Sequence, residues 1–448
     1  MTARLAIALT LTLALATACT PTQLDGADGD DKKIQDRPLV VPPVPTEMIR
    51  YDDVEIPKNP DGSAKVWVTP EDFGAVGNDG KDDSDAFDKL AAAMEQDVGV
   101  MIPARRYHLS RTWKLPYVKG GRIVGAGGFQ HHHMKKKAAL QGASSDLYWI
   151  GEEGGVMIQM IGSNSIIESL NLFGQDKAGV GFYVIKPKGA KGIGTGKASV
   201  RGMSVLGCNT GIRLGNGGAN VDNILWEYIY IHECGTGLLL DTQMAMGHYF
   251  AYLQLRSVKT AIWVRRGGDL VVRGGLNVGT DVFLKVGDKD GASPGRNNGM
   301  ILIEGIKADA QNVDLTWLDV ATPTDCAITF NNCHQAWTRD GSKYPRKWIV
   351  RGPTKLAIRD CVNVFGTDSF VLEPHHRDNP EVYTHNPETG DIKPTRKPRM
   401  PNVLLDRCRV DFGSGPKDWI DVDKGHYTFK VRDCYRGTGE PIEDAKTR

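Results

Sequence analysis

The chain repeats a short pattern of apolar and polar positions along most of its length. In this six-residue pattern the first and third residues are apolar, and the sixth is often cysteine. Copies occur as MSVLGC ending at Cys208, IYIHEC at Cys234, ITFNNC at Cys333, LAIRDC at Cys361, VLLDRC at Cys408, FKVRDC at Cys434, LNLFGQ at Gln175, LQLRSV at Val258, LNVGTD at Asp281 and IKADAQ at Gln311. Because apolar residues at a spacing of two face one side of a β-strand, each copy predicts a strand with one buried face.

Successive copies end 33, 26, 24, 23, 30, 22, 28, 47 and 26 residues apart. A repeat of this length with Gly and Asn at its corners is typical of one coil of a solenoid. Several copies are followed by a second short apolar run, as in TGIRL, TGLLL, TAIWV and TDVFL. The sequence therefore predicts an all-β protein, a single-stranded right-handed parallel β-helix of about ten or more coils. We expect this domain at residues 65–448, with an inserted loop at 373–400.

The histidine, glutamate and cysteine in IYIHECGTGLLLD, residues 229–241, suggest a metal site or a thiol nucleophile when they are considered alone. The repeat predicts instead that Cys234 points into the coil at a corner. We expect stacked free thiols there, formed by Cys208 with Cys234, Cys333 with Cys361, and Cys408 with Cys434. In-register side chains run parallel, which gives poor disulfide geometry.

A helix is predicted before the first coils, within VTPEDFGAVGNDGKDDSDAFDKLAAAM at residues 68–94. Its apolar residues lie on one helical face, and two aspartates favour its N-terminus. These residues are Phe87, Leu90, Ala91 and Met94 on the face, and Asp82 and Asp83 at the N-terminus.

This segment, followed by GVMIPARRYHLS at 99–110, resembles the N-terminal cap of the pectate-lyase-like superfamily of right-handed parallel β-helix proteins, in its pectate lyase 3 type. Asn78 and Ser84 depart from it, since Asp and Thr are usual there. The resemblance implies that the helix closes the first coil. It admits lyases, hydrolases, epimerases and phage tailspikes, so the activity has to be inferred from the site.

The N-terminus has the layout of an export signal. MTARLAIALTLTLALATAC holds one Arg, an apolar run too short to span a bilayer, and small residues before Cys19. ATAC resembles a bacterial lipoprotein signal, which implies removal of residues 1–18 and lipidation of Cys19, with simple secretion as the alternative. Residues 19–64 then form a lipidated N-terminus and flexible linker. We expect a bacterial cell-envelope protein, held at the outer membrane by its lipid.

Charge is nearly balanced over the whole chain, with 55 basic and 54 acidic residues. This balance gives no global attraction to nucleic acid or to anionic membranes, so a charged partner has to be bound locally.

The repeat places a group of polar and aromatic side chains on the outward face of the central coils. Flat aromatic rings beside polar groups suit a sugar chain. The expected catalytic residues are His232, Arg256, Tyr230, Lys307 and Asp309, and the expected substrate-binding residues are Tyr228, Tyr252, Gln254 and Asn277.

Eliminative cleavage of a uronate polymer needs a cation that neutralises the sugar carboxylate and a base that removes the adjacent proton. Arg256 or Lys307 suits the first role, and His232 or Tyr230 suits the second. Hydrolysis needs two carboxyl groups, and Asp309 is the one acid among the central outward positions.

Two further acids, Glu233 and Glu304, are secondary candidates. Glu233 is adjacent to His232 in the strand and should therefore face the opposite side, and Glu304 lies before the six-residue pattern of its coil. We therefore expect a lyase that cleaves an acidic, uronate-containing polysaccharide by β-elimination. The alternatives are a glycoside hydrolase on the same fold and a non-catalytic glycan-binding or structural β-helix. The sequence leaves a requirement for calcium open.

Overall fold

The structure of the protein is a computed structural model. It describes residues 39–43, 51–117, 120–127, 144–161, 164–187, 195–217, 221–242, 245–287, 299–309, 315–322, 325–336, 346–365, 369–373, 382–385, 392–395, 401–410, 420–422, 428–436 and 438–442. The chain divides into two units, Met1–Lys33 and Ile34–Arg448, and the described residues belong to the second. The expected signal peptide at 1–18 and the expected lipidation site Cys19 lie outside these ranges. Within them, every helix is too short or too polar to span a bilayer.

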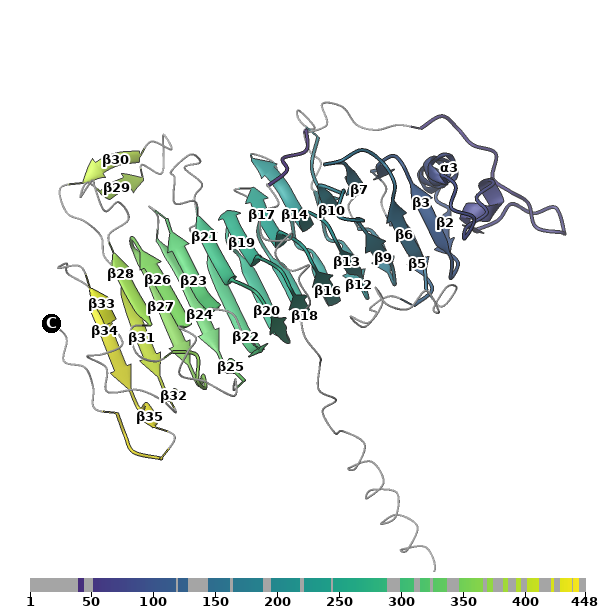
Figure 1. Cartoon of the computed structure of the whole chain (residues 1–448). Helices are drawn as coiled ribbons and strands as arrows, with labels where there is room; N and C mark the ends of the chain where they lie inside the picture. The colour runs from purple at the N-terminus through teal and green to yellow at the C-terminus, as the bar shows by residue number, and fades with distance from the viewer. Residues whose placement is uncertain are drawn as a thin grey trace, which may run out of the picture. The chain divides into compact units, whose positions relative to one another are not determined.

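One face of the second unit is an 11-stranded parallel sheet, to which successive coils contribute one strand each (Figure 1). In chain order its strands are β4 (Trp113–Leu115), β7 (Val156–Met160), β10 (Val180–Val184), β14 (Thr210–Gly217), β17 (Thr236–Thr242), β19 (Thr260–Arg266), β21 (Val282–Gly287), β23 (Leu315–Ala321), β26 (Arg346–Arg351), β28 (Phe370–Glu373) and β33 (Ile420–Val422). Each strand pairs with the strands one repeat before and after it, as Phe182 does with Ile158 and Ile212. This register is that of a parallel β-helix, and it confirms the predicted fold class.

An 18-stranded sheet supplies the other faces of the coils. Its strands are β1 (Trp67–Val68), β2 (Gly99–Ile102), β3 (Arg106–Leu109), β5 (Arg122–Gly125), β6 (Asp146–Trp149), β8 (Ile166–Glu168), β9 (Asn171–Phe173), β12 (Ser199–Arg201), β13 (Ser204–Leu206), β16 (Leu225–His232), β18 (His248–Arg256), β20 (Leu270–Val278), β22 (Met300–Asp309), β24 (Cys326–Asn331), β25 (His334–Gln335), β27 (Thr354–Arg359), β31 (Asn402–Asp406) and β34 (Thr428–Arg432). Short parallel pairs join β11 (Thr195–Gly196) to β15 (Val221–Asp222) and β32 (Arg409–Val410) to β35 (Tyr435–Arg436).

Two rows of residues with left-handed backbone bend the coils. We name the first row bend 1; its members are Ser169, Gly202, Tyr228, Tyr252, Gly274, Gly305, Asn332, Asp360, Arg407 and Asp433, with φ between 50° and 70°. The second row, bend 2, contains Gly207, Glu233, Ser257 and Gly279. A left-handed residue interrupts the strict alternation of a strand. The alternation of inward and outward positions therefore starts anew after each bend.

Large apolar side chains stack inside the coils from one repeat to the next. The rings of Trp226 and Phe250 lie 5.2 Å apart with planes 2° apart, and those of Trp317 and Trp348 lie 5.8 Å apart with planes 3° apart. Because each coil buries these residues against its neighbours, the stacked coils share one hydrophobic core.

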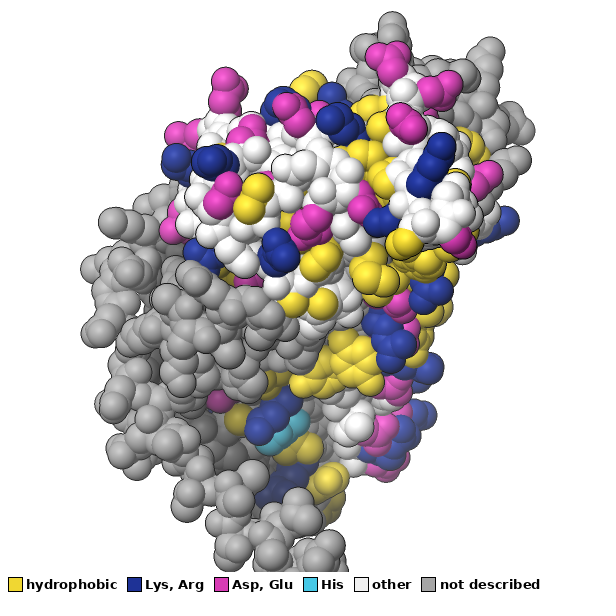
Figure 2. All heavy atoms as spheres, turned by 90° about the vertical axis from the view of Figure 1, so that its right-hand side faces the viewer, with side chains coloured by type: hydrophobic (Ala, Val, Ile, Leu, Met, Phe, Trp, Pro, Cys, Tyr) yellow, Lys and Arg dark blue, Asp and Glu magenta, His cyan; other side chains and the backbone are white. Residues whose placement is uncertain are grey.

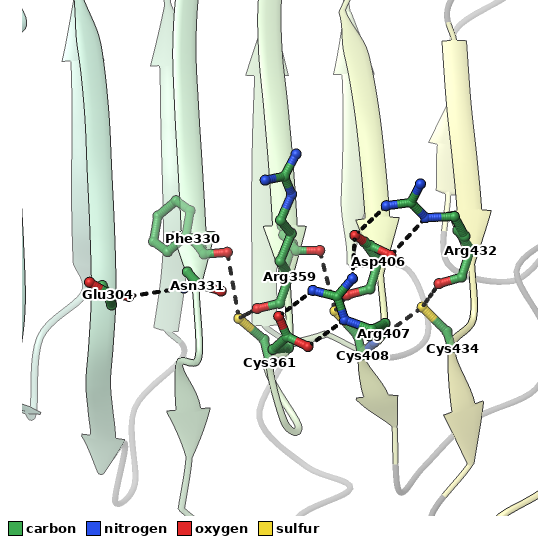
Figure 3. Close-up of polar contacts among 12 residues, drawn as sticks. Glu304, Phe330, Asn331, Arg359, Cys361, Asp406, Arg407, Cys408, Arg432 and Cys434 are labelled. Atoms are coloured by element: carbon green, nitrogen blue, oxygen red, sulfur yellow. Dashed lines mark hydrogen bonds and ion pairs between the residues drawn. The ribbon is translucent and has the colours of Figure 1, made fainter.

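The seven cysteines of the described residues are free and buried, and all of them except Cys326 follow one of the two bends. Cys208 and Cys234 follow left-handed residues of bend 2. The other stack follows bend 1 and consists of Cys333, Cys361, Cys408 and Cys434, the last three of which are shown in Figure 3. The prediction that all six share one corner is therefore wrong. The prediction treated the two bends as one corner, because at both bends an alternating strand ends in a left-handed residue that is followed by a small inward residue.

The predicted neighbours within each stack are confirmed. The backbone N–H of Cys333 donates to Sγ of Cys361, and that of Cys408 donates to Sγ of Cys434, each over 3.3 Å. The stack continues between Cys361 and Cys408, because β27 pairs directly with β31.

The helix expected before the coils is α3 (Ser84–Glu95), preceded by a 3₁₀ turn, η1 (Pro70–Phe73). Its predicted apolar face is buried and packs against β2 and β4. Asp83 occupies the N-cap, and the carboxylate of Asp82 accepts a hydrogen bond of 3.0 Å from the Ser84 N–H. Asp82 therefore serves the helix terminus, whereas the Asp83 carboxylate makes no cap hydrogen bond and accepts one of 3.0 Å from the His108 N–H.

The expected insertion at 373–400 separates β28 from β31 in the chain. Its described residues form an antiparallel pair, β29 (Val382–His385) with β30 (Ile392–Thr395). Since Arg359 of β27 is directly in register with Asp406 of β31, the insertion leaves the pairing of the coils unbroken. This explains the 47-residue step in the repeat.

Candidate functional site

The segment between bend 1 and bend 2, which we name the middle face, carries most of the predicted site residues. Its inward positions, such as Leu172, Val205, Ile231 and Leu255, belong to the core. Its outward positions are in register across the coils in two rows. Row 1 contains Arg106, Asp146, Asn171, Ser204, Tyr230, Gln254, Leu276, Lys307 and His334, and row 2 contains His108, Tyr148, Phe173, Leu206, His232, Arg256, Val278 and Asp309.

Tyr230, His232 and Arg256 come together on this face as the sequence predicted. The rings of Tyr230 and His232 lie 5.7 Å apart, and both side chains lie outside the core cluster that contains Ile231. Arg256 is in register with His232 on the next coil. Nε2 of His232 lies 3.5 Å from Oε1 of Glu233. A base, a phenol and a cation thus share one small area.

The expected exposure of this area is wrong in part. Tyr230 is 1% exposed and His232 is 7% exposed, whereas Gln254 and Arg256 are half-buried. The alternation of a strand decides only whether a side chain leaves the core. It does not decide whether solvent reaches it.

The pKa of Tyr230 argues against its role as a base. Burial raises this pKa well above the ordinary value of a phenol, and the Glu233 carboxylate adds to the rise, while the Arg256 guanidinium opposes it. Tyr230 is therefore a protonated phenol at neutral pH, which excludes it as the base and leaves its hydroxyl proton in place. His232 remains as the base of this group.

Glu233 lies at bend 2 with φ of 53°, which takes it out of the strand's alternation. Its carboxylate thereby reaches the imidazole of His232. Strand alternation predicted that Glu233 faces away from His232. This prediction is wrong, because the chain turns at Glu233 before it reaches the corner residue Cys234.

Tyr228 and Tyr252 lie at bend 1, at the edge of the middle face. They are opposite each other in adjacent coils, with ring centroids 5.9 Å apart. Their side chains are 48% and 40% exposed. Both positions therefore fit the expected contact with substrate.

Asn277 points into the coil, so its predicted place on the outward face is wrong. It is in register with the core residue Leu255, and its amide exchanges hydrogen bonds of 2.8 and 3.1 Å with the Thr280 hydroxyl. Gly275 takes the inward position that Leu253 and Ile306 hold in the adjacent coils, so the inward positions of β20 are Gly275 and Asn277 rather than the apolar Leu276 and Val278. Leu276 takes the outward position instead.

Lys307 and Asp309 face outward as predicted, but an apolar coil separates them from the histidine group. Leu276 lies between Gln254 and Lys307 in row 1, and Val278 occupies the corresponding place in row 2. At a strand spacing of about 4.8 Å, Asp309 is two coils from Arg256. Lys307 and Asp309 therefore lie apart from the histidine group, with His334 in register beside Lys307.

A buried polar group in the N-terminal coils was missed by the sequence. Asp146 accepts hydrogen bonds from Ser144 Oγ at 2.7 Å and from Asn171 Nδ2 at 2.9 Å. Burial raises the pKa of Asp146, while these donors and Arg106 oppose the rise. The guanidinium of Arg106 lies 4.5 Å from the centre of the Tyr148 ring. The alternation of DLYW at 146–149 could have identified this group, because Leu147 and Trp149 are buried in the core and Asp146 and Tyr148 point the other way.

Glu304 belongs to a ladder of charges on the face before bend 1. In register, this ladder contains Glu168, Arg201, Glu227, Ala251, Arg273, Glu304, Asn331, Arg359, Asp406 and Arg432. Glu304 pairs with Arg273 at 2.8 Å and accepts from Asn331 at 3.0 Å, the latter drawn in Figure 3. Because Glu304 is already engaged, it is a poor candidate for an acid in hydrolysis.

The described residues contain no cluster of three or more His, Cys, Asp or Glu side chains arranged to hold a metal ion.

Comparisons with known proteins give structural likenesses only. No family model matches the chain, and no curated protein matches it. Among solved structures, a GH87 alpha-1,3-glucanase catalytic unit from Streptomyces thermodiastaticus strain HF3-3 is 14% identical, with 87% of this chain and 72% of that chain covered and a TM-score of 0.46. The A-module of the Azotobacter vinelandii mannuronan C-5 epimerase AlgE4 is 13% identical, with 84% and 97% covered and a TM-score of 0.45. ORF18 of Geobacillus virus E2 is 13% identical, with 85% and 63% covered and a TM-score of 0.46.

Proposed function

We propose that this protein is a polysaccharide-processing enzyme, a lyase that cleaves a uronate-containing polymer by β-elimination. The observation that supports this activity is the grouping of His232, Tyr230 and Arg256 outside the core on the middle face. These residues supply a base, a proton donor and a cation, which are the groups that elimination requires.

In this reaction His232 removes the proton from the carbon that bears the sugar carboxylate. The electron pair of that C–H bond forms a carbon–carbon double bond, and the bond to the glycosidic oxygen breaks. Tyr230 donates its proton to the departing oxygen. Arg256 neutralises the carboxylate, which makes the adjacent proton more acidic, and Glu233 stabilises the imidazolium that forms.

Substrate access to Tyr230 and His232 requires this surface to open, because both side chains are buried. The exposed rings of Tyr228 and Tyr252 border the same segment, so a sugar chain that binds there lies next to it. Binding of the polymer at bend 1 is thus the first step, and exposure of the histidine group is the second.

Two alternatives have support from particular residues. The raised pKa of Asp146 suits the general acid of a hydrolase. Hydrolysis also needs a second carboxyl group, however, and the neighbours of Asp146 in row 1 are Arg106 and Asn171. The burial of Tyr230 and His232 favours a module that binds glycan without cleaving it.

For location, we propose that lipidation of Cys19 holds the protein in the bacterial cell envelope, where it meets an acidic polysaccharide. The grounds are the sequence pattern ATAC and the preceding apolar segment.

A panel of uronate-containing polysaccharides incubated with the full chain tests the activity. Ultraviolet absorbance from unsaturated ends identifies a lyase, and new reducing ends without this absorbance identify a hydrolase. Binding without either product identifies the glycan-binding module. The same assay with a calcium chelator, and then with calcium restored, decides whether the metal is needed.

A further inference from the structure

Two tyrosines occupy backbone positions that tyrosine rarely adopts. Tyr228 has φ of 53° and Tyr252 has φ of 66°, and the residues in register on either side are Gly202 and Gly274. A left-handed conformation costs an L-residue with a side chain about 1–2 kcal/mol relative to glycine. Bulky residues held in such a conformation in adjacent coils point to a function that uses their side chains.

These rings are open to solvent at both ends of the pair. The flanking glycines have no side chain, and an added Cβ at Gly274 would meet no atom within 4 Å. The apolar C–H face of a pyranose packs on such a ring, because the ring face is electron-rich. Bend 1 thus offers two adjacent platforms for sugar rings.

A depression of about 380 Å³ lies beside Tyr228. It is lined by Glu168, Ser169, Arg201, Gly202 and Tyr228. The exposed guanidinium of Arg201 lies 6.0 Å from the centre of the Tyr228 ring, and it forms no ion pair with any residue that the structure describes. Glu168, in contrast, lies 3.5 Å from Arg122. Arg201 therefore retains its donors for an anionic group at the edge of the ring.

Figure 2 views the protein from the side of α3 and shows basic and acidic side chains mixed with hydrophobic ones on the described surface. Within the charge ladder, two of the four arginines have acidic partners, Arg273 with Glu304 and Arg432 with Asp406. Arg201 differs from these two because its neighbours Glu168 and Glu227 make no ion pair with it. A carboxylate on the ligand would supply the acidic partner that Arg201 lacks among the described residues.

We propose that this depression is a binding subsite for a hexuronate ring of an acidic polysaccharide. The pyranose face packs on Tyr228, its carboxylate accepts hydrogen bonds from Arg201, and the next sugar along the chain contacts Tyr252. This inference rests on the proposed function and adds the place where a uronate ring binds and the residue that selects its carboxylate. A guanidinium and a carboxylate form a strong charge-assisted pair.

Calorimetric titration of the full chain with oligogalacturonate and oligomannuronate, and with a neutral cello-oligosaccharide of equal length, tests the subsite. Arg201→Ala should weaken binding of a uronate oligomer about tenfold or more, because a charge-assisted hydrogen bond is lost. It should leave binding of the neutral oligomer unchanged. Tyr228→Asn, which tolerates the left-handed backbone, should weaken binding of both.

Arg359→Ala is the matched control, because Arg359 is an exposed arginine of the same ladder in a distant coil. Equal weakening by Arg201→Ala and Arg359→Ala, or no binding of either uronate oligomer by the unaltered protein, would overturn the subsite. Arg201-dependent binding without any cleavage product would uphold the subsite and reject the lyase. Unsaturated products formed with a KM that Arg201→Ala does not change would uphold the lyase and reject the subsite.

Discussion

Tyr228 and Tyr252 are in register on adjacent strands, both with left-handed backbone and with ring centroids 5.9 Å apart. The other members of bend 1 are glycine, serine, asparagine and aspartate, which adopt this conformation more readily, together with one long side chain, Arg407. The pair therefore carries backbone strain at an exposed place, where packing gains little in return.

Replacement of Tyr252 by Asn should stabilise the protein by about 1 kcal/mol, because asparagine adopts the left-handed conformation more readily. Denaturant unfolding measures this difference. Tyr435→Asn is the control, since Tyr435 is 41% exposed and has no left-handed backbone. A loss of stability in Tyr252→Asn would show that the backbone at this position is not strained. If the platform binds sugar, the same variant should lose affinity for glycan.

His232→Ala and Arg256→Ala should each lower turnover on the order of 100-fold, because each removes a group that acts in the transition state. His232→Ala should also lower the melting temperature, because this side chain is buried against Glu233, whereas loss of the half-buried Arg256 should change it less. Initial rates on the polymer that yields product, with Arg359→Ala as the control, measure the effect. Full activity in both variants would move the catalytic site elsewhere on the solenoid.

The buried His248 should make the protein sensitive to acid. Burial lowers its pKa from 6.5 to about 4, and its Nε2–H donates to the Val221 carbonyl over 3.0 Å. Between these pH values the unfolded chain takes up a proton that the folded chain refuses, so stability is present above about pH 6.5 and is lost as the pH falls. The expected loss is about 3 kcal/mol.

Denaturant unfolding of the unaltered protein and of His248→Gln at several pH values from neutral to mildly acidic measures this loss. The variant should be less stable at neutral pH, because it packs less well, and the gap should narrow in acid. Parallel curves for the two proteins would exclude His248 as the source of the acid sensitivity.

The thiols should react slowly with iodoacetamide under native conditions and rapidly after unfolding, because all the described cysteines are buried. Cys234→Ala should destabilise the protein by about 1–3 kcal/mol through the small cavity it leaves. Intact mass counts the alkylated groups. A mass that shows three disulfides would contradict the free stacks at bend 1 and bend 2.

Cys19→Ala should abolish incorporation of labelled palmitate in a bacterial host with an outer membrane. The unaltered chain should carry the label and fractionate with the envelope. Soluble, unlabelled protein whose mature N-terminus differs from Cys19 would show simple secretion instead.

The sequence determined the parts of this protein that depend on local periodicity. The alternation around Ile229 and Ile231 and its return after about one coil predicted stacked parallel strands, since a side chain buries its apolar surface only against the next repeat. The spacing of Phe87, Leu90 and Met94 predicted the helix face in the same way. Alternation also placed His232 beside Arg256, because in-register neighbours follow once the repeat is aligned.

Only the tertiary structure decided at which residues the chain bends and, after each bend, which side chains point inward. The register of β20 with its neighbours places Asn277 inward and Leu276 outward, and the two bends separate Cys234 from Cys333, although both cysteines end the same sequence pattern. Residue type does not mark these places, because Tyr228 adopts the conformation as Gly202 does. Burial of Tyr230 and the raised pKa of Asp146 likewise depend on groups brought from other coils. A local pattern fixes which side chains leave the core, whereas their solvation is set by contacts between residues far apart in the chain.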